Sequence, residues 1–208
     1  MTAAAIAPPP ADLPTDALRR RLDDPATQLA VIERAPDGRR DEHIAAMVAN
    51  TPFRRLVGPS DAIERGLRRH GADTEALTEI AGLLQLFSTL AACREMDVLI
   101  EWQTRRQCPL FHVDAHPLRL LCAYLGPGLE YLDEADADRD ALGRGGRAPG
   151  RDPVCRGGPQ TVRRVAHQAV ALFKGTGWPG NAGRGLVHRS PPTSPRCPRL
   201  VLRIDVRQ

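Results

Sequence analysis

The sequence is poor in several features that mark common classes of protein. It has one lysine, Lys174, among 29 basic residues, and aromatic residues make up only 4% of its 208 positions. It contains no P-loop motif, no GxSxG motif and no apolar run of the roughly 18 residues that a membrane span needs. These absences argue against a P-loop nucleotide-binding protein, a serine hydrolase of that type and a membrane partner.

Cysteine and charge give two further exclusions. The five cysteines are odd in number and form no CxxC pair, which argues against a disulfide scaffold or a zinc finger and favours a reducing, cytoplasmic setting. The excess of arginine over lysine accompanies much alanine, glycine and proline, as a GC-rich coding sequence would produce. With so few aromatic residues and no regular basic stripe, we expect no nucleic-acid partner. The substrate, a small molecule or a protein, is not identified by the sequence.

The chain divides into a helical and a β-rich part. Residues 1–14 contain a Pro8-Pro9-Pro10 run and are predicted to be a disordered lead-in. Residues 15–94 are predicted to form an N-terminal helical layer with a short strand at 29–33; the clearest helix follows the N-cap residue Asp73. At Met96 the apolar period changes to two, which predicts strands.

Many short strand candidates follow in residues 95–208, which predicts a sandwich or barrel. A loop at about 133–160 has no apolar period and is predicted to be mobile. The fold class is therefore α+β, one integrated domain in which N-terminal helices pack on a jelly-roll-like barrel. The predicted strands after Trp102 are 109–113, 118–125, 129–132, 161–165, 169–174, 185–189 and 199–206.

One segment carries most of the chemistry. In an extended strand residues i and i+2 point to the same side, so His112 and Asp114 can bind one metal ion, and His188 at the end of an apolar segment is the best third ligand. Two histidines and one carboxylate form the facial triad of non-haem Fe(II) oxygenases. If Cys108 joined them, the four ligands would form a closed tetrahedral Zn²⁺ site.

The order of these residues resembles the double-stranded β-helix of prolyl-hydroxylase-like oxygenases that depend on 2-oxoglutarate and Fe(II). In that family an arginine on the last strand, about ten residues after the second histidine, holds the cosubstrate carboxylate. Arg199 follows His188 by eleven residues and would take this role. Tyr124 would be a second cosubstrate contact, provided that the chain keeps it in phase with His112.

A broader resemblance covers roughly residues 15–206. The segments CPLFHVDAHPLRLLCAYLGPGLEYL (108–132), DRDALGRGG (138–146) and ALFKGTGWPGNAGRGLVHRSPP (171–192) are similar to the bacterial family known as domain of unknown function 1826. This resemblance brings no established activity.

Two hypotheses follow. The first is a metal-binding barrel that acts as an Fe(II)- and 2-oxoglutarate-dependent oxygenase. The alternative is a non-catalytic zinc-binding protein of metal homeostasis with Cys108 as the fourth ligand.

Overall fold

The computed structural model describes residues 15–49, 53–143 and 152–207. The predicted lead-in 1–14 and the centre of the predicted loop 133–160 lie outside these described residues. Within them, no helix is both long and apolar enough to cross a membrane. The helices are α1 (Thr15–Asp23), α2 (Gly38–Ala46), α3 (Ser60–Arg69) and α4 (Thr74–Ala91). The strands are β1 (Leu29–Ile32), β2 (Phe53–Gly58), β3 (Met96–Gln103), β4 (Leu118–Leu125), β5 (Glu130–Tyr131), β6 (Arg163–Arg164), β7 (Val170–Lys174), β8 (His188–Arg189) and β9 (Arg199–Val206).

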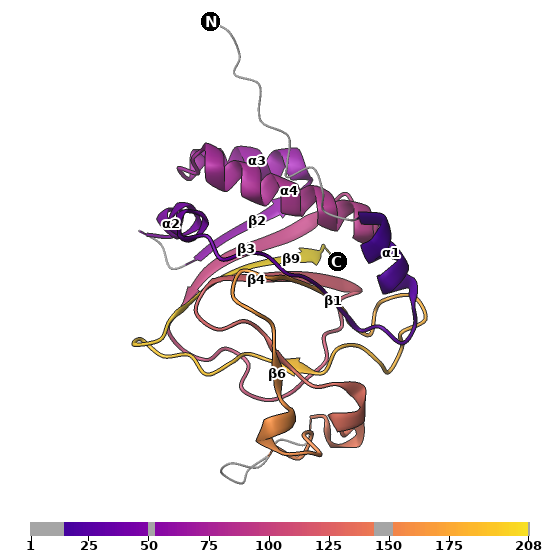
Figure 1. The fold of residues 1–208 in the computed structure, drawn as a ribbon. Helices are drawn as coiled ribbons and strands as arrows, with labels where there is room; N and C mark the ends of the chain where they lie inside the picture. Colours follow the sequence, from indigo (N-terminus) through magenta and orange to yellow (C-terminus); the bar gives the residue numbers. More distant parts are fainter. Residues whose placement is uncertain (1–14, 50–52, 144–151, 208) are drawn as a thin grey trace, which may run out of the picture.

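Two antiparallel sheets and one layer of helices form the molecule. The larger sheet has the strand order β1-β7-β4-β9-β3-β2, and the smaller one has the order β6-β5-β8. The helices cover one face of the larger sheet, and the smaller sheet with its connecting loops lies on the other side (Figure 1). The predicted α+β class, with helices packed on antiparallel strands, is confirmed.

The helix α4 forms where its sequence predicts it. The side chain of Asp73 accepts a hydrogen bond from the backbone N–H of Ala76 at 2.9 Å, which caps the first turn. The apolar residues of α4 recur every three or four positions and are buried against the larger sheet. The helix ends at Ala92, whose φ of 49° is left-handed.

The alternation along β9 divides its side chains between two environments. Leu200, Leu202 and Ile204 are buried in the core beneath the helices. Arg199, Val201 and Arg203 face the opposite side, where they line a cavity between the larger sheet and the loops. The predicted bounds 199–206 of this strand are confirmed.

Other elements differ from the sequence-based expectation. Helix α1 and strand β2 were not predicted, whereas the strand expected at 29–33 is present as β1; β1 and β2 form the two edges of the larger sheet. The predicted strand 109–113 is absent as a strand, because only His112 makes a β-bridge there. The described ends of the loop 133–160 contain short 3₁₀ turns at Glu134–Asp136 and Arg139–Ala141, and a third, Pro159–Thr161, begins at its C-terminal end.

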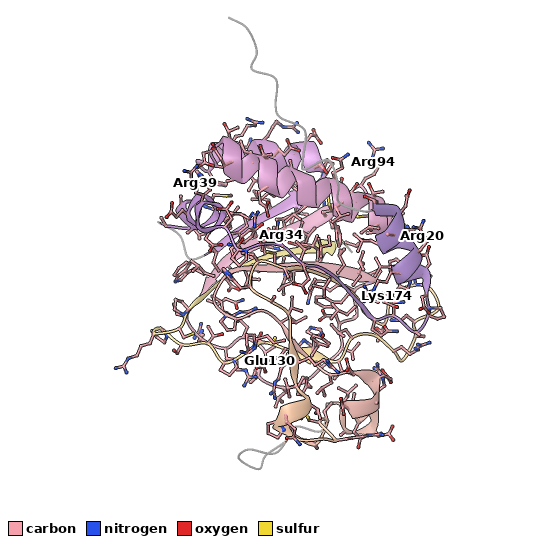
Figure 2. All side chains as sticks on the ribbon, in the orientation of Figure 1. Arg20, Arg34, Arg39, Arg94, Glu130 and Lys174 are labelled. Atoms are coloured by element: carbon pink, nitrogen blue, oxygen red, sulfur yellow. The ribbon has the colours of Figure 1, made fainter. Side chains whose placement is uncertain are left out.

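The single lysine has a structural position. Lys174 is buried at the end of β7, and its ammonium group donates to the carbonyl oxygens of Leu22 and Asp24, both at 3.0 Å. It therefore caps the C-terminal end of α1 and attaches that helix to the sheet (Figure 2). Both hydrogen bonds of the Lys174 ammonium group are made at the end of α1, and neither involves His112 or His188. We therefore assign Lys174 no role in the site.

Candidate metal centre

His112 and His188 are held side by side by their backbones. The N–H of His112 donates to the carbonyl oxygen of His188 at 2.9 Å, and the N–H of His188 donates to the carbonyl oxygen of His112 at 3.0 Å. This is the bridge at which the loop before β4 meets β8. Two residues that are 76 positions apart in the sequence are thereby brought to neighbouring places.

Asp114 reaches the same place from the turn that precedes β4. The N–H of Thr176 donates to the carbonyl oxygen of Asp114 at 2.8 Å. A Cβ atom at Gly175 would lie 2.1 Å from the carbonyl oxygen of His116 and 2.5 Å from that of Asp114. Only glycine permits this close approach of the two loops, so the Gly-rich turn after β7 helps to position the carboxylate.

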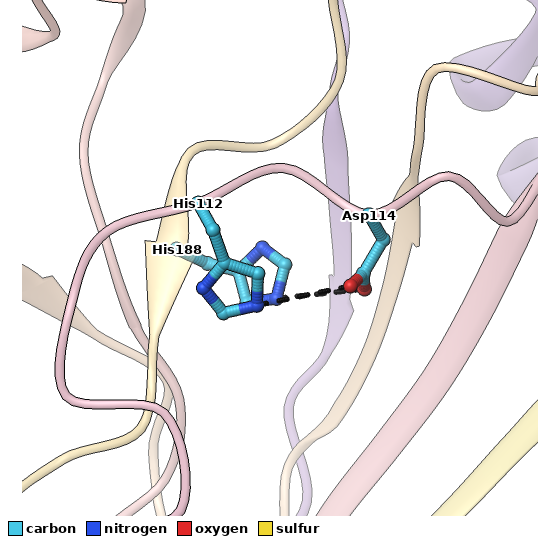
Figure 3. A group of neighbouring side chains, drawn as sticks. All are labelled: His112, Asp114 and His188. Carbon is cyan, nitrogen blue, oxygen red and sulfur yellow. Dashed lines mark ion pairs between the residues drawn. The ribbon is translucent and has the colours of Figure 1, made fainter. Parts of the chain in front are cut away.

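The three side chains converge on one point (Figure 3). Their candidate ligand atoms all lie within 4.8 Å of one another. The Nε2 atom of His112 is 3.8 Å from Oδ1 of Asp114, and Nε2 of His188 is 3.5 Å from Oδ2. This spacing is suitable for one metal ion between two imidazoles and a carboxylate.

Each imidazole is oriented by a carbonyl oxygen two residues before it. Nδ1 of His112 lies 3.0 Å from the oxygen of Leu110, and Nδ1 of His188 lies 3.0 Å from the oxygen of Leu186. A proton on each Nδ1 makes these hydrogen bonds, so each Nε2 keeps a lone pair directed toward Asp114.

The environment of His188 keeps its ring neutral. Its side chain is buried, between the rings of Phe173 at 4.8 Å and His112 at 4.4 Å. Burial lowers the pKa of His188 to about 4, and the nearby carboxylate of Asp114 opposes this shift only in part. A neutral imidazole is the form that binds a metal ion.

The carboxylate is oriented by Arg119 on β4. Nη1 of Arg119 donates to Oδ2 of Asp114 at 2.5 Å. The other side of the same guanidinium donates to both carboxylate oxygens of Asp205, at 2.6 and 3.0 Å. The hydrogen bond from Arg119 leaves Oδ1 of Asp114, on the side of His112, without a protein donor among the described residues.

A cavity of about 270 Å³ contains both histidines and Arg199. Arg199 is 2% exposed; its Nε donates to the carbonyl oxygen of Pro127 at 2.7 Å and its Nη1 to Oε1 of Gln103 at 3.0 Å. Its Nη2 has no hydrogen-bond partner within the described part of the chain. Burial lowers the pKa of Arg199 to about 10, so the group stays charged at neutral pH. The cavity therefore contains a buried cation with a free donor.

Tyr124 does not lie in this cavity, contrary to the expectation. Its hydroxyl donates to Oε1 of Glu79 on α4 at 2.6 Å, within the core under the helices. The chain between His112 and β4 is a loop, and an even number of residues between two positions places their side chains on the same face only within a continuous strand. Within β4 the cavity is lined by Arg119 and Leu121, and the alternation directs Tyr124 to the other face.

Cys108 borders the cavity but does not complete a ligand set. The group of converging ligand atoms consists of His112, Asp114 and His188, and the thiol of Cys108 is outside it. Its backbone N–H donates to the hydroxyl of Ser190 at 3.3 Å. The closed four-ligand zinc site is therefore not formed in this arrangement.

Four polar residues of the cavity were not identified from the sequence: Glu101, Gln103, Gln107 and Ser190. A signal was present for the first two, because the period of two in β3 places them opposite Val98 and Ile100. The alternation along β9 places Arg203 on the same face as Arg199. Which residues surround it depends on the strands that flank β9, and these could not be read from the sequence.

A family model matches residues 15–205 of this chain, under the description protein of unknown function (DUF1826). The chain belongs to the DUF1826 family. No curated protein matches this DUF1826 chain.

Solved structures show the fold that this DUF1826 member shares. It is similar to a rice dioxygenase for auxin oxidation, with a TM-score of 0.53 and 14% identity over 92% of this chain and 78% of that one. Weaker similarities include a Pseudomonas putida prolyl-4-hydroxylase (TM-score 0.46, 13% identity, 92% and 94% covered). Another is the Fe(II)/α-ketoglutarate-dependent dioxygenase TqaL (TM-score 0.46, 10% identity, 92% and 86% covered). At such low identity the likeness to the rice enzyme concerns the fold alone, and this agrees with the predicted resemblance.

Proposed function

We propose that this protein is an Fe(II)- and 2-oxoglutarate-dependent oxygenase with a double-stranded β-helix core. The observation that carries the proposal is the convergence of His112, Asp114 and His188 beside a cavity that both histidines and Arg199 line. The rice dioxygenase, which shares the fold, supports the choice among the metal enzymes that use such ligands.

The donor set suits the metal. Two Nε2 atoms with free lone pairs and one carboxylate oxygen occupy one side of an ion and leave its other positions open for ligands, as in non-haem Fe(II) oxygenases. The thiol of Cys108, which would favour zinc, is not part of the group. Bound there, Fe(II) would supply, with O₂ and 2-oxoglutarate, the oxidation of the cosubstrate to succinate and CO₂ coupled to the hydroxylation of a substrate C–H bond.

The residues of the chain orient the metal ligands and bind the cosubstrate. Arg119 holds Asp114 by one oxygen, and the carbonyl oxygens of Leu110 and Leu186 hold the imidazoles. Arg199 offers its free Nη2 to a carboxylate of the cosubstrate. Phe173 packs against His188 and keeps water from that side of the site.

Anaerobic titration of the purified protein with Fe(II), followed by metal analysis, tests the site. We expect about one Fe(II) per chain, and at least about 100-fold weaker binding in Asp114→Ala, because a metal ligand is lost. His116→Ala is the matched control, since His116 belongs to the same loop but not to the ligand group.

Addition of 2-oxoglutarate and O₂ then tests the chemistry. We expect slow formation of succinate by the wild-type protein, and its loss in Arg199→Gln while Fe(II) binding is retained. Absence of Fe(II) binding by the wild-type protein, or equal binding by Asp114→Ala, would contradict the proposal.

A further inference from the structure

The floor of the cavity is formed by strands that place several charged residues in a regular array. The register pairs Arg203 on β9 with Leu99 on β3 and with Leu121 on β4. Two residues further along β9, on the same face, Asp205 pairs with Arg119. Arg203 thus lies between two apolar neighbours. On the same face of the sheet it is close to Arg119, which holds Asp114, and four residues from Arg199 along β9.

The three arginines of the cavity differ in how their donors are used. Arg119 makes three hydrogen bonds to Asp114 and Asp205, and Arg199 makes two, to Pro127 and Gln103. The guanidinium of Arg203 makes no hydrogen bond to any residue that the structure describes.

Arg203 has only a shared counter-ion. Its Nε forms an ion pair with Oδ2 of Asp205 at 2.9 Å but no hydrogen bond, and the side chain as a whole is 32% exposed. Both oxygens of Asp205 already accept from Arg119. The ion pair uses Nε, so the two terminal nitrogens of Arg203, which have no hydrogen bond to any described residue, remain available to a bound ligand.

We propose that Arg203 binds an anionic group of the primary substrate, which is therefore a small organic acid: a carboxylate, sulfonate or phosphate ester. This inference rests on the proposed function and names its substrate class. The planar guanidinium matches such oxyanions in a bidentate manner. Leu99 and Leu121, on the two sides of Arg203, offer apolar contact to the carbon skeleton of the acid.

The size of the cavity agrees with a small acid. Its volume of about 270 Å³ is bordered by His112, His188, Arg199 and Arg203, and is near the lower end of the range typical of small-molecule sites. Arg199 has its own free nitrogen for the cosubstrate. Of the three guanidinium groups of the cavity, those of Arg199 and Arg203 keep free donors and thus provide for two separate anionic groups.

The test compares a charged and an uncharged probe of equal size. Wild-type protein is loaded anaerobically with Fe(II) and saturating 2-oxoglutarate, and is titrated with butanesulfonate and with butanesulfonamide by calorimetry or NMR. We expect saturable binding of the sulfonate and at least about 10-fold weaker binding of the sulfonamide.

In Arg203→Gln we expect the affinity for the sulfonate to fall by at least about 10-fold, while Fe(II) and 2-oxoglutarate bind as in the wild type. Arg203→Lys should recover part of the affinity, and circular dichroism confirms that each variant is folded. Arg207→Gln is the matched control, because this arginine follows β9 and is paired with Glu95 outside the cavity.

Three results would overturn the inference: equal binding of the two probes, an Arg203→Gln variant that binds the sulfonate as tightly as the wild type, or a variant that loses 2-oxoglutarate instead. The last of these would leave the proposed function intact. If the wild-type protein binds no Fe(II), the proposed function fails. The same two titrations on the metal-free protein then decide the role of Arg203 by the same criteria.

Discussion

The two faces of the larger sheet both contain arginines that are at least partly buried, but their donors are used differently. On the helical face, Arg34 donates to Glu79 at 2.6 Å and to the carbonyl oxygen of Gln168 at 2.7 Å, and its third nitrogen contacts the sulfur of Cys122. On the cavity face, Arg199 and Arg203 each retain a buried nitrogen without a hydrogen-bond partner among the described residues. Arg34 lies between the helices and the sheet, in the middle of the molecule (Figure 2).

The difference shows which face is completed by the chain itself. A buried charge is tolerated when its partners are complete, as for Arg34 with Glu79. Donors that remain free on a face lined by candidate metal ligands indicate that another molecule completes them. Consecutive residues of one strand can thus serve stability and binding separately.

The largest expected effect is on the free energy of unfolding, and it compares Glu79 on the helical face with Glu101 on the cavity face. In Glu79→Ala the buried Arg34 loses its ion pair and Tyr124 loses its acceptor, so we expect unfolding to become easier by about 3–5 kcal/mol. In Glu101→Ala only hydrogen bonds from Gln103 and Gln107 are lost, so we expect about 1 kcal/mol.

Urea denaturation followed by circular dichroism measures both variants. Glu79→Gln is the control that retains an acceptor for Tyr124 but removes the charge, and it should lie between Glu79→Ala and the wild type. Equal losses of stability in the two alanine variants would remove the distinction between the faces.

The next effect compares two consecutive leucines of β4. Leu120 is fully buried under the helices, whereas its neighbour Leu121 lines the cavity. We expect Leu120→Ala to destabilise by about 2–5 kcal/mol because it leaves a hole in a close-packed core. Leu121→Ala should cost about 1 kcal/mol, because its side chain borders a space that already exists. Thermal unfolding of the two variants under one set of conditions measures both losses of stability. Equal losses would contradict the expected difference between the two leucines.

The smallest effect concerns a second cluster of a histidine with carboxylates, on the helical side. His43, Asp73 and Glu75 also converge within 4.8 Å, but Asp73 caps α4 and contacts Nδ1 of His43 at 2.5 Å. The hydrogen bond with Asp73 raises the pKa of His43 above 6.5. The pKa of Asp73 lies below 3.8, because hydrogen bonds from Ala76 and His43 outweigh the opposing effect of burial.

The sign of the pH effect follows from these two shifts. The contribution of His43 is complete below pH about 6.5 and is lost as the pH rises through its folded pKa; that of Asp73 is complete above pH about 3.8 and is lost as the pH falls through its folded pKa. The melting temperature of His43→Gln should therefore fall below that of the wild type mainly between these pH values. An unchanged difference at pH 9 would contradict this interpretation of the pair.

Much of this arrangement followed from local sequence patterns. The alternation in β9 and the apolar period of α4 depend on short-range geometry, which the residues themselves specify. The convergence of His112 and Asp114 with His188 was expected on a strand, whereas a loop with one bridge produces it.

What the sequence did not reveal depends on contacts between distant segments. The role of Arg119 requires Asp205 to pair opposite it, and the position of Arg203 requires the register of β9 with β3 and β4. Tyr124 was misplaced because a loop before β4 resets the alternation. Strand β2 was missed because it is short and carries two arginines after a proline.

The reciprocal hydrogen bonds between His112 and His188 have a consequence for how the site responds to strain. Since each backbone holds the other, the two imidazoles move as one body, and a shift of β8 carries both. Asp114 is attached separately, through Arg119 and Thr176, to the strands of the larger sheet. The two histidines are therefore fixed by each other, whereas the carboxylate is fixed by β4 and by the turn after β7.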